Sequence, residues 1–111
     1  LLSNHPNIIT PHRAQACDSH VFHQYTLRIV NADRDALVKY LNEHDIPCGV
    51  YYPVPLHRQK AYADVGVKEE NFPVTNQLVR EVISLPMHSE LDTDQIKYIT
   101  DKVLRFLDQK N

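Results

Sequence analysis

The chain has 111 residues, with 12 basic and 14 acidic side chains and a net charge of −2, which is enough for one domain with a modest core. Its basic residues are scattered, which argues against nucleic-acid binding because that requires clustered lysines and arginines. No apolar run approaches the roughly 20 residues that span a bilayer, and no signal-peptide pattern opens the chain. We therefore expect no nucleic-acid and no membrane partner.

Cysteine and glycine are both scarce. Cys17 and Cys48 make a poor disulfide framework, so a reducing cytoplasm is the expected location. With only two glycines, the chain has no glycine-rich loop that could hold a phosphate. It opens on Leu1-Leu2 without an initiator Met, from which we expect a piece excised from a longer polypeptide.

The first predicted elements are an irregular leading segment and a strand. Residues 1–20 mix Asn, Pro, His and Ser and should be irregular, with a short strand over Asn7–Thr10. Residues alternate in polarity over Val21–Val30, which predicts a strand. Its apolar face should consist of Val21, His23, Tyr25, Leu27 and Ile29.

A helix and a second strand should follow. Asn31 and Asp33 are N-cap candidates for a helix to about Asp45, whose apolar stripe is Leu37, Tyr40, Leu41 and His44. Pro47 cannot continue a helix, so Ile46–Tyr52 is predicted as a strand. On the strand's parity, Tyr52 is packed with Ile46, Cys48 and Val50, whereas Tyr51 points outward.

The loop after this strand is stiffened by Pro53 and Pro55, which restrict the backbone of Tyr52 and Val54. A rigid loop that carries aromatic and imidazole groups can form a pocket wall. An ordinary strand–loop–helix connection is the alternative.

The second half should alternate short elements with one long helix. The pattern predicts a helical turn over Gln59–Ala63, a charged surface loop over Asp64–Asn71, and a short helix capped by Thr75 and ending at Glu81. That helix should turn Leu78, Val79 and Val82 inward. A buried strand over Val82–Leu85 should end at Pro86. Asp92 and Gln95 form a capping-box pair at the start of an amphipathic helix to about Leu107, with Ile96, Ile99, Val103 and Phe106 on its apolar face.

This order of elements predicts an α+β fold, a small and mostly antiparallel sheet covered by helices on one face.

Two groups of side chains could carry chemistry. Cys17, His20, His23 and Cys48 could bind a structural zinc ion, but a spacing of three places His20 and His23 on opposite faces of a strand. A nucleophile pair would use Cys48 or Cys17 with His57 or His23 as base, yet a thiol on a buried strand is usually inert. Asp33, Asp35, Asp92 and Asp94 sit at helix starts, where the macrodipole favours them without catalysis. We expect no catalytic residue and no metal ligand in this chain.

Three stretches together resemble one family. They are Val21-Phe22-His23-Gln24-Tyr25-Thr26-Leu27-Arg28, then Ile46-Pro47-Cys48-Gly49-Val50-Tyr51-Tyr52-Pro53-Val54-Pro55-Leu56-His57-Arg58-Gln59, and finally Phe72-Pro73-Val74-Thr75 followed by Val82-Ile83-Ser84-Leu85-Pro86-Met87-His88 and Leu91. From about residue 20 to its end, the chain resembles the C-terminal domain of the DegT-type nucleotide-sugar aminotransferases, fold-type I enzymes that use pyridoxal 5'-phosphate.

The resemblance implies that residues 21–111 are the C-terminal small domain and that residues 1–20 are a remnant of the interdomain connection. It implies that Tyr51, Tyr52, His57 and Gln59 bind substrate, although many members have His in the place of Tyr51. The parent enzyme would be a homodimer that transfers an amino group from glutamate to a UDP- or dTDP-linked keto-sugar for surface polysaccharide or amino-sugar synthesis. The motifs lean toward UDP-linked 3-keto sugars.

No lysine of this chain stands in the context of the family's cofactor lysine, so the resemblance implies no cofactor-binding residue here and no activity of the chain alone. The face that met the large domain should be exposed, as an apolar patch that favours self-association. Two alternatives stay open: a free-standing α+β ligand-binding or regulatory module, and a zinc-stabilised interaction domain.

Overall fold

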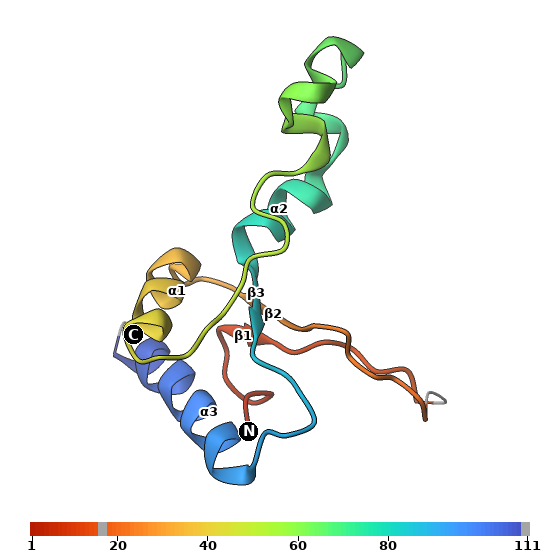
Figure 1. Ribbon diagram of the computed structural model, residues 1–111. Coiled ribbons are helices and arrows are strands. Elements are labelled where there is room, and N and C mark those ends of the chain that lie inside the picture. Colours follow the sequence, from red (N-terminus) through yellow and green to blue (C-terminus); the bar gives the residue numbers. More distant parts are fainter. Residues whose placement is uncertain (16–17, 110–111) are drawn as a thin grey trace.

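The computed structural model describes residues 1–15 and 18–109 of the chain (Figure 1). Its strands and helices are, in chain order, β1 (Ile8–Ile9), β2 (Tyr25–Ile29), α1 (Arg34–Asn42), the 3-10 helices η1 (Leu56–Arg58), η2 (Lys60–Val65) and η3 (Glu69–Asn71), α2 (Pro73–Glu81), β3 (Val82–Leu85) and α3 (Thr93–Asp108). Among the helices of the described residues, none has both the length and the apolar composition that crossing a bilayer requires.

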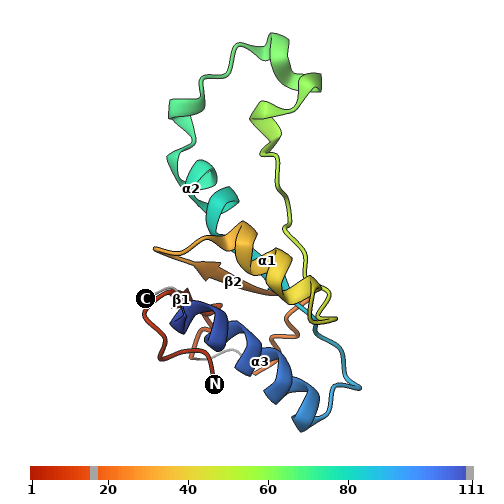
Figure 2. The ribbon, with the colours of Figure 1, turned by 90° about the vertical axis from the view of Figure 1, so that its left-hand side faces the viewer.

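The three strands form one antiparallel sheet in the order β1-β2-β3. Helices α1 and α3 lie together over one face of this sheet (Figures 1 and 2). The predicted α+β fold, with helices covering one face of a small antiparallel sheet, is confirmed.

The core lies between the sheet and these two helices. It also receives two side chains from the first ten residues, Leu2 and Ile8, and Asn7 donates from Nδ2 to the Val30 carbonyl at 2.8 Å. The leading segment is therefore packed against the rest of the domain, while the boundary at residue 20 stays a prediction. The buried hydrophobic residues are Leu2, Ile8, Leu27, Ile29, Leu37, Leu41, Ile46, Ile83, Leu85, Ile99, Val103, Phe106 and Leu107.

Strand β2 begins four residues later than the alternation predicts. Phe22 has a φ of 46°, in the left-handed region that an extended strand cannot contain. Val21 and His23 consequently lie in an exposed loop and not on the core face. From Tyr25 onward the prediction is correct, because Leu27 and Ile29 are buried.

Helix α1 begins as predicted and ends earlier. The Asp33 carboxylate accepts a hydrogen bond from the Ala36 amide at 2.9 Å, which is the N-cap geometry. The helix ends at Asn42 and not near Asp45, whose φ of 57° places it in the left-handed region. That conformation stops a right-handed helix and turns the chain back toward the sheet.

The strand predicted over Ile46–Tyr52 does not form. Its only bridge within the described residues joins Gly49 to Ser84 of β3, with Gly49 N to Ser84 O at 3.0 Å and Ser84 N to Gly49 O at 2.7 Å. Pro47 has no N–H to donate, and the chain leaves the sheet before the proline-rich loop. One residue of pairing thus replaces the predicted strand.

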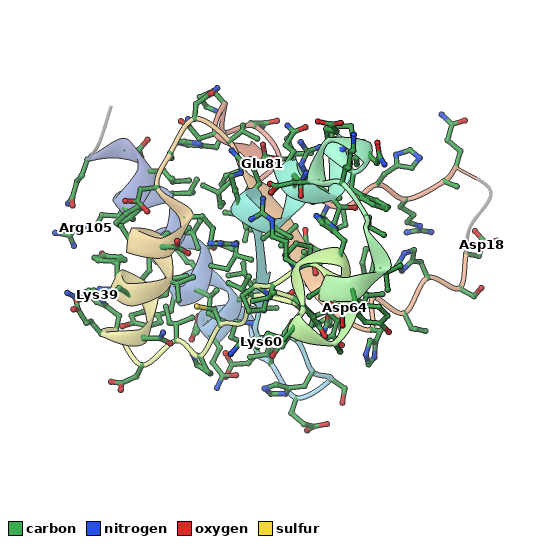
Figure 3. The ribbon with its side chains drawn as sticks, turned by 90° about the horizontal axis from the view of Figure 1, so that it is seen from above. Asp18, Lys39, Lys60, Asp64, Glu81 and Arg105 are labelled. Carbon is green, nitrogen blue, oxygen red and sulfur yellow. The ribbon has the colours of Figure 1, made fainter. Side chains whose placement is uncertain are left out.

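Residues 53–79 form an arm that projects away from the sheet and returns through α2 into β3 (Figure 1). The arm contains η1, η2 and η3. Helix η2 confirms the helical turn predicted over Gln59–Ala63 and continues to Val65, whereas η3 adds a turn within the loop predicted over Asp64–Asn71. Viewed from above, Lys60 and Asp64 lie on the arm, on the side away from Lys39 and Arg105 (Figure 3).

Helix α2 begins at Pro73, so the predicted cap at Thr75 is wrong. Phe72 occupies the N-cap position without a side-chain hydrogen bond. Proline at the first helical position has its φ already set for a helix and has no N–H to leave unpaired, so it can start α2 without a polar cap.

The predictions for β3 and α3 are confirmed except for Ile96, which was expected on the apolar face of the helix and is 41% exposed, because it lies in the first turn of α3, beyond the edge of the core. Strand β3 spans Val82–Leu85. At the start of α3, Asp92 accepts from the Gln95 amide at 2.8 Å, and the Gln95 side chain accepts from the Asp92 amide at 3.0 Å. This reciprocal capping box opens a helix whose buried face contains Ile99, Val103 and Phe106.

Candidate functional site

The proline-rich loop and helix α2 form the two walls of a cleft of about 330 Å³. The cleft brings together three of the four residues predicted to bind substrate: Tyr51, Tyr52 and Gln59. The opposite wall comes from α2 and the start of β3. The lining residues are Tyr51, Tyr52, Val54, Pro55, Leu56, Gln59, Thr75, Leu78, Val79 and Val82.

Among the described residues, no charged side chain lines this cleft. Its polar groups are the two tyrosine hydroxyls, the Gln59 amide and the Thr75 hydroxyl, set among aliphatic side chains. Such neutral groups can donate and accept hydrogen bonds. A mostly apolar cleft with a few hydrogen-bonding groups suits a polyhydroxylated ring better than a small ion.

Both tyrosines are exposed. Tyr51 is 49% exposed and Tyr52 is 75% exposed, their rings meet edge to face at 6.0 Å, and the peptide bond between them is cis. The prediction that Tyr52 is packed is therefore wrong, because strand parity ends where the chain leaves the sheet after Gly49. Both rings are available to a ligand.

Tyr51 stands between two clefts. It also lines a neighbouring cleft of about 260 Å³, together with His23, Gln24, Pro47, Cys48, Gly49, Ser84, Leu85, Pro86 and Met87. The ring thus separates the loop–α2 cleft from a second hollow beside the end of β3.

His57 does not line the cleft with the tyrosines. Its half-buried ring stacks on Phe72, with centroids 4.7 Å apart and an interplanar angle of 14°. In the described part of the chain, its Nε2 atom is buried and has no hydrogen-bond partner. His57 therefore joins the two sides of the arm next to the cleft, and its contact with a substrate stays a prediction.

Two further contacts hold the sides of the arm together. Arg58 forms an ion pair with Glu69, and Asn76 donates from Nδ2 to the Glu69 carbonyl at 2.8 Å. The first contact joins η1 to η3, and the second joins α2 to η3. These contacts fix the arm's outer end although its residues are almost all exposed.

The α2 wall is the part of the site that sequence reasoning missed. Leu78, Val79 and Val82 were expected to face the core because of their spacing, and Thr75 was expected to be a cap. All four are half-buried because α2 meets the sheet only at its end and turns the rest of this stripe to the cleft. The apolar stripe of the helix is the sequence feature that could have indicated this wall, but a stripe does not specify which surface it covers.

Cys48 is not activated for nucleophilic chemistry. Burial raises the pKa of its thiol, which donates weakly to the Val38 carbonyl at 3.9 Å. Cys17, the other cysteine of the proposed nucleophile pair and zinc site, lies outside the described residues. Among those described, no group of three or more His, Cys, Asp or Glu side chains is placed to hold a metal ion.

The described lysines do not fit a covalent pyridoxal phosphate site. None of them lines the loop–α2 cleft or the neighbouring cleft that shares Tyr51, and most make surface contacts: Lys39 with Glu43, Lys68 with Glu70, Lys97 with Asp101, and Lys102 over the Tyr98 ring. Lys60 is exposed on η2. A Schiff-base lysine projects into an enclosed pocket, which the described lysines do not do in this structure.

Comparison with known proteins gives a consistent result. The profile of the DegT/DnrJ/EryC1/StrS aminotransferase family matches residues 1–104. The chain is 44% identical over 87 residues to a pleiotropic regulatory protein of Geobacillus stearothermophilus, covering 78% of this chain and 23% of that protein. It is 41% identical over 88 residues to the UDP-N-acetyl-3-dehydro-alpha-D-glucosamine 3-aminotransferase of Acidithiobacillus ferrooxidans, covering 79% and 23%.

A solved structure agrees with the fold. The structure of DesV from S. venezuelae, determined with a ketimine intermediate, superimposes with a TM-score of 0.82 at 32% sequence identity, covering 95% of this chain and 28% of that one. The chain thus spans about a quarter of the length of the proteins it matches.

Proposed function

The chain belongs to the DegT/DnrJ/EryC1/StrS aminotransferase family, and from this premise we propose that it is the C-terminal small domain of a sugar aminotransferase, with residues 1–20 as the connection to a large domain. Members of this family use pyridoxal 5'-phosphate. Because the described lysines do not fit a covalent cofactor site, we assign the cofactor to another part of the enzyme. The 111-residue chain alone should be colourless and inactive.

The proposed reaction moves an amino group from glutamate to a keto-sugar linked to UDP or dTDP, for surface polysaccharide or amino-sugar synthesis. Relatives at 33% to 42% identity carry both nucleotide types in their names: a dTDP-3-amino-3,6-dideoxy-alpha-D-galactopyranose transaminase and a UDP-2-acetamido-2-deoxy-3-oxo-D-glucuronate aminotransferase. The motifs favour a UDP-linked 3-keto sugar.

The cleft between the proline-rich loop and α2 is the observation that carries the proposal. Tyr51 and Tyr52 provide exposed aromatic faces and hydroxyl groups, and Gln59 provides an amide on the same wall. These groups would bind hydroxyl or diphosphate oxygens of the nucleotide sugar and orient it. His57 stacks on Phe72 beside the cleft, and its role in substrate binding rests on the family resemblance alone. The group-transfer chemistry itself belongs to the cofactor.

We further propose that the whole enzyme is a cytoplasmic homodimer. The arm and the loop before it expose a series of apolar side chains, which fits a surface that is covered in a larger assembly. They are Tyr51, Tyr52, Val54, Leu56, Tyr62, Val65, Val67, Phe72 and Val74.

The decisive experiment begins with the coding DNA upstream of Leu1. The longest open frame should give a protein with the absorbance of bound pyridoxal phosphate that transfers an amino group from glutamate to UDP- or dTDP-keto-sugars. A start codon at Leu1 itself, with a stop just upstream, would instead favour a free-standing module that only binds a ligand. Metal analysis of the chain and of Cys48→Ser tests the zinc-stabilised alternative, which requires bound metal.

Substitutions in the long form test the cleft. Tyr51→Phe, Tyr52→Phe and Gln59→Ala should each raise the KM for the nucleotide sugar about fivefold, since each removes one hydrogen bond worth about 1 kcal/mol. Tyr62→Phe is the matched control, because Tyr62 lies on the arm and does not line the cleft. Equal KM values for all four variants would refute the assignment of the cleft.

A further inference from the structure

Arg34 is a buried cation at the start of α1, and interactions within α1 do not explain why a cation is buried there. It is the first residue of α1, where the positive end of the helix dipole disfavours a cation. It is nevertheless only 8% exposed. A buried guanidinium needs acceptors for its N–H groups, and those acceptors show what Arg34 does.

The guanidinium binds the junction between α2 and β3. Its Nη2 donates to the Val79 carbonyl at 3.0 Å, its Nη1 donates to the Val82 carbonyl, and its Nε donates to the Asp35 carboxylate at 2.7 Å. The last four carbonyls of a helix have no partner within the helix, and Val79 is among the last four of α2. A cation at this end also complements the dipole of α2.

The Val82 carbonyl lies on the outer edge of β3. Ser84 directs its N–H and carbonyl to Gly49, away from β2. Val82 precedes Ser84 by two residues and therefore points its backbone groups to the same edge. Arg34 takes the acceptor that a neighbouring strand would otherwise use, since pairing along Ile46–Tyr52 is limited to Gly49 in the described chain.

The same junction is held from the opposite side by β2. Arg28 pairs with the Glu81 carboxylate, with Nη2 at 2.7 Å and Nε at 2.8 Å from Oε2. Glu81 lies between the two residues that Arg34 binds through their backbone. The end of α2 is thus clamped between α1 and β2.

Both residues that Arg34 binds line the proposed substrate cleft, since Val79 and Val82 belong to its α2 wall. We infer that Arg34 is a positioning residue for nucleotide-sugar binding, which sets the α2 wall against the tyrosine wall without touching the substrate. This inference rests on the proposed function for its ligand, but not for its geometry. A lysine would keep the charge but cannot reach two carbonyls with one planar fork.

Hydrogen–deuterium exchange of the 111-residue chain tests the geometry without any activity. In Arg34→Lys and Arg34→Met, exchange in residues 73–82 should become faster by roughly tenfold, because two buried carbonyls lose their donor. Residues 93–108 of α3 report on global unfolding, so their exchange should become faster by no more than that of residues 73–82. Both regions should keep their exchange rates in the control Arg105→Lys, a change on the exposed face of α3. Unchanged exchange in residues 73–82 of both variants would overturn the inference.

Kinetics of the long form test the consequence for binding. Arg34→Lys should raise the KM for the nucleotide sugar roughly tenfold and leave the KM for glutamate and kcat within about twofold of the wild-type values. A fall in kcat with an unchanged sugar KM would overturn the positioning role. A wild-type protein without amino transfer, combined with faster exchange in the Arg34 variants, would refute the proposed function and leave the Arg34 clamp standing.

Discussion

The ring of Tyr51 lies directly against the backbone of Gly49. A Cβ atom at Gly49 would be 2.5 Å from both Cζ and the hydroxyl oxygen of Tyr51, closer than a Cβ atom approaches other side chains in proteins. Gly49 is also the residue that pairs with Ser84 at the edge of β3. The absence of a side chain at Gly49 therefore lets one residue complete the sheet edge and seat the tyrosine that separates the two clefts.

We expect Gly49→Ala to displace the Tyr51 ring at little cost in stability. The atoms that would clash are at the far end of an exposed side chain, which can rotate away for about 1 kcal/mol. The KM for the nucleotide sugar should rise as much as in Tyr51→Phe or more. NMR of the Tyr51 ring protons in the 111-residue chain would show the displacement directly.

Gly66→Ala separates this steric effect from a general loss of glycine. Gly66 has a φ of 68°, and no described atom lies within 4 Å of the position that an alanine Cβ would occupy, so alanine there strains only the backbone, by about 1–2 kcal/mol. It should leave the Tyr51 resonances unchanged. Equal effects of the two substitutions on Tyr51 would contradict the contact.

Glu81 should make stability depend on pH in the acid range. Burial opposes ionisation of its carboxylate, but the hydrogen bonds from Gln77 and Arg28 and the charge of Arg28 outweigh burial and hold its pKa below the ordinary value. A lowered folded pKa stabilises the native state fully above the unfolded pKa of about 4.3. This contribution is lost as the pH falls toward the folded pKa, because the unfolded state then binds the proton first.

Urea denaturation between about pH 3 and pH 6 measures this effect. In Glu81→Gln the free energy of unfolding should fall less steeply with decreasing pH than in the wild type. Glu43→Gln, at the exposed end of α1, is the comparison. A slope in Glu81→Gln as steep as in the wild type would show that the ion pair with Arg28 does not contribute.

Removing the capping box should weaken α3 and with it the core. Asp92→Ala leaves the Gln95 amide without its acceptor and should lower the free energy of unfolding by about 1 kcal/mol. Asp92→Asn should cost less, since asparagine is an equally good N-cap residue. Asp94→Ala removes an exposed carboxylate in the same turn that is not part of the capping box. If it lowers the free energy of unfolding as much as Asp92→Ala does, the effect is due to charge alone and not to the capping box.

Cys48 should react slowly with thiol reagents in the folded chain. Burial raises its pKa, which lowers the thiolate fraction near neutral pH. In a Cys17→Ser background, alkylation by iodoacetamide under mildly alkaline conditions should be slower than for a small free thiol and should reach the ordinary rate in urea. A folded rate equal to the unfolded one would contradict the burial.

The exposed apolar side chains of the arm should make the 111-residue chain self-associate. Val65 and Val74 are 62% and 67% exposed, and their replacement by lysine should shift the chain toward monomer in sedimentation velocity over a concentration series. Val21→Lys changes a valine outside the arm that is even more exposed, at 82%, and should leave the association unchanged. A wild-type chain that is monomeric at all concentrations would count against the proposal that this surface is covered in a larger enzyme.

Local signals in the sequence were sufficient for the elements that depend on neighbouring residues. Asp33 and Asp92 are caps because their side chains reach amides three residues further along the chain, and this geometry is set by spacing alone. Periodicity alone likewise predicts which residues of β2, from Tyr25 to Ile29, and of α3 face the core. The same holds for the family motifs, which are short runs of neighbouring residues.

The sequence predictions fail where the backbone conformation of a single residue, or a partner that is distant in the chain, determines the local structure. Phe22 and Asp45 adopt positive φ values, which the periodicity of the sequence does not predict. Phe22 delays the start of β2, and Asp45 turns the chain after α1. The alternation of Ile46–Tyr52 predicts a strand, but a strand forms only where a partner edge continues, and β3 offers Ser84 to Gly49 alone among the described residues.

By itself, the sequence determined the fold class, the helix starts at the two aspartate caps and the proline-stiffened loop that leads to Gln59, because these follow from short-range periodicity, capping and proline stereochemistry. Only the tertiary structure decided that α2 forms the facing wall, that His57 stacks on Phe72 instead of lining the cleft, and that Arg34 holds Val79 and Val82. Those contacts join residues 15 to 48 positions apart. Such contacts depend on how the elements pack in space, which no local pattern specifies.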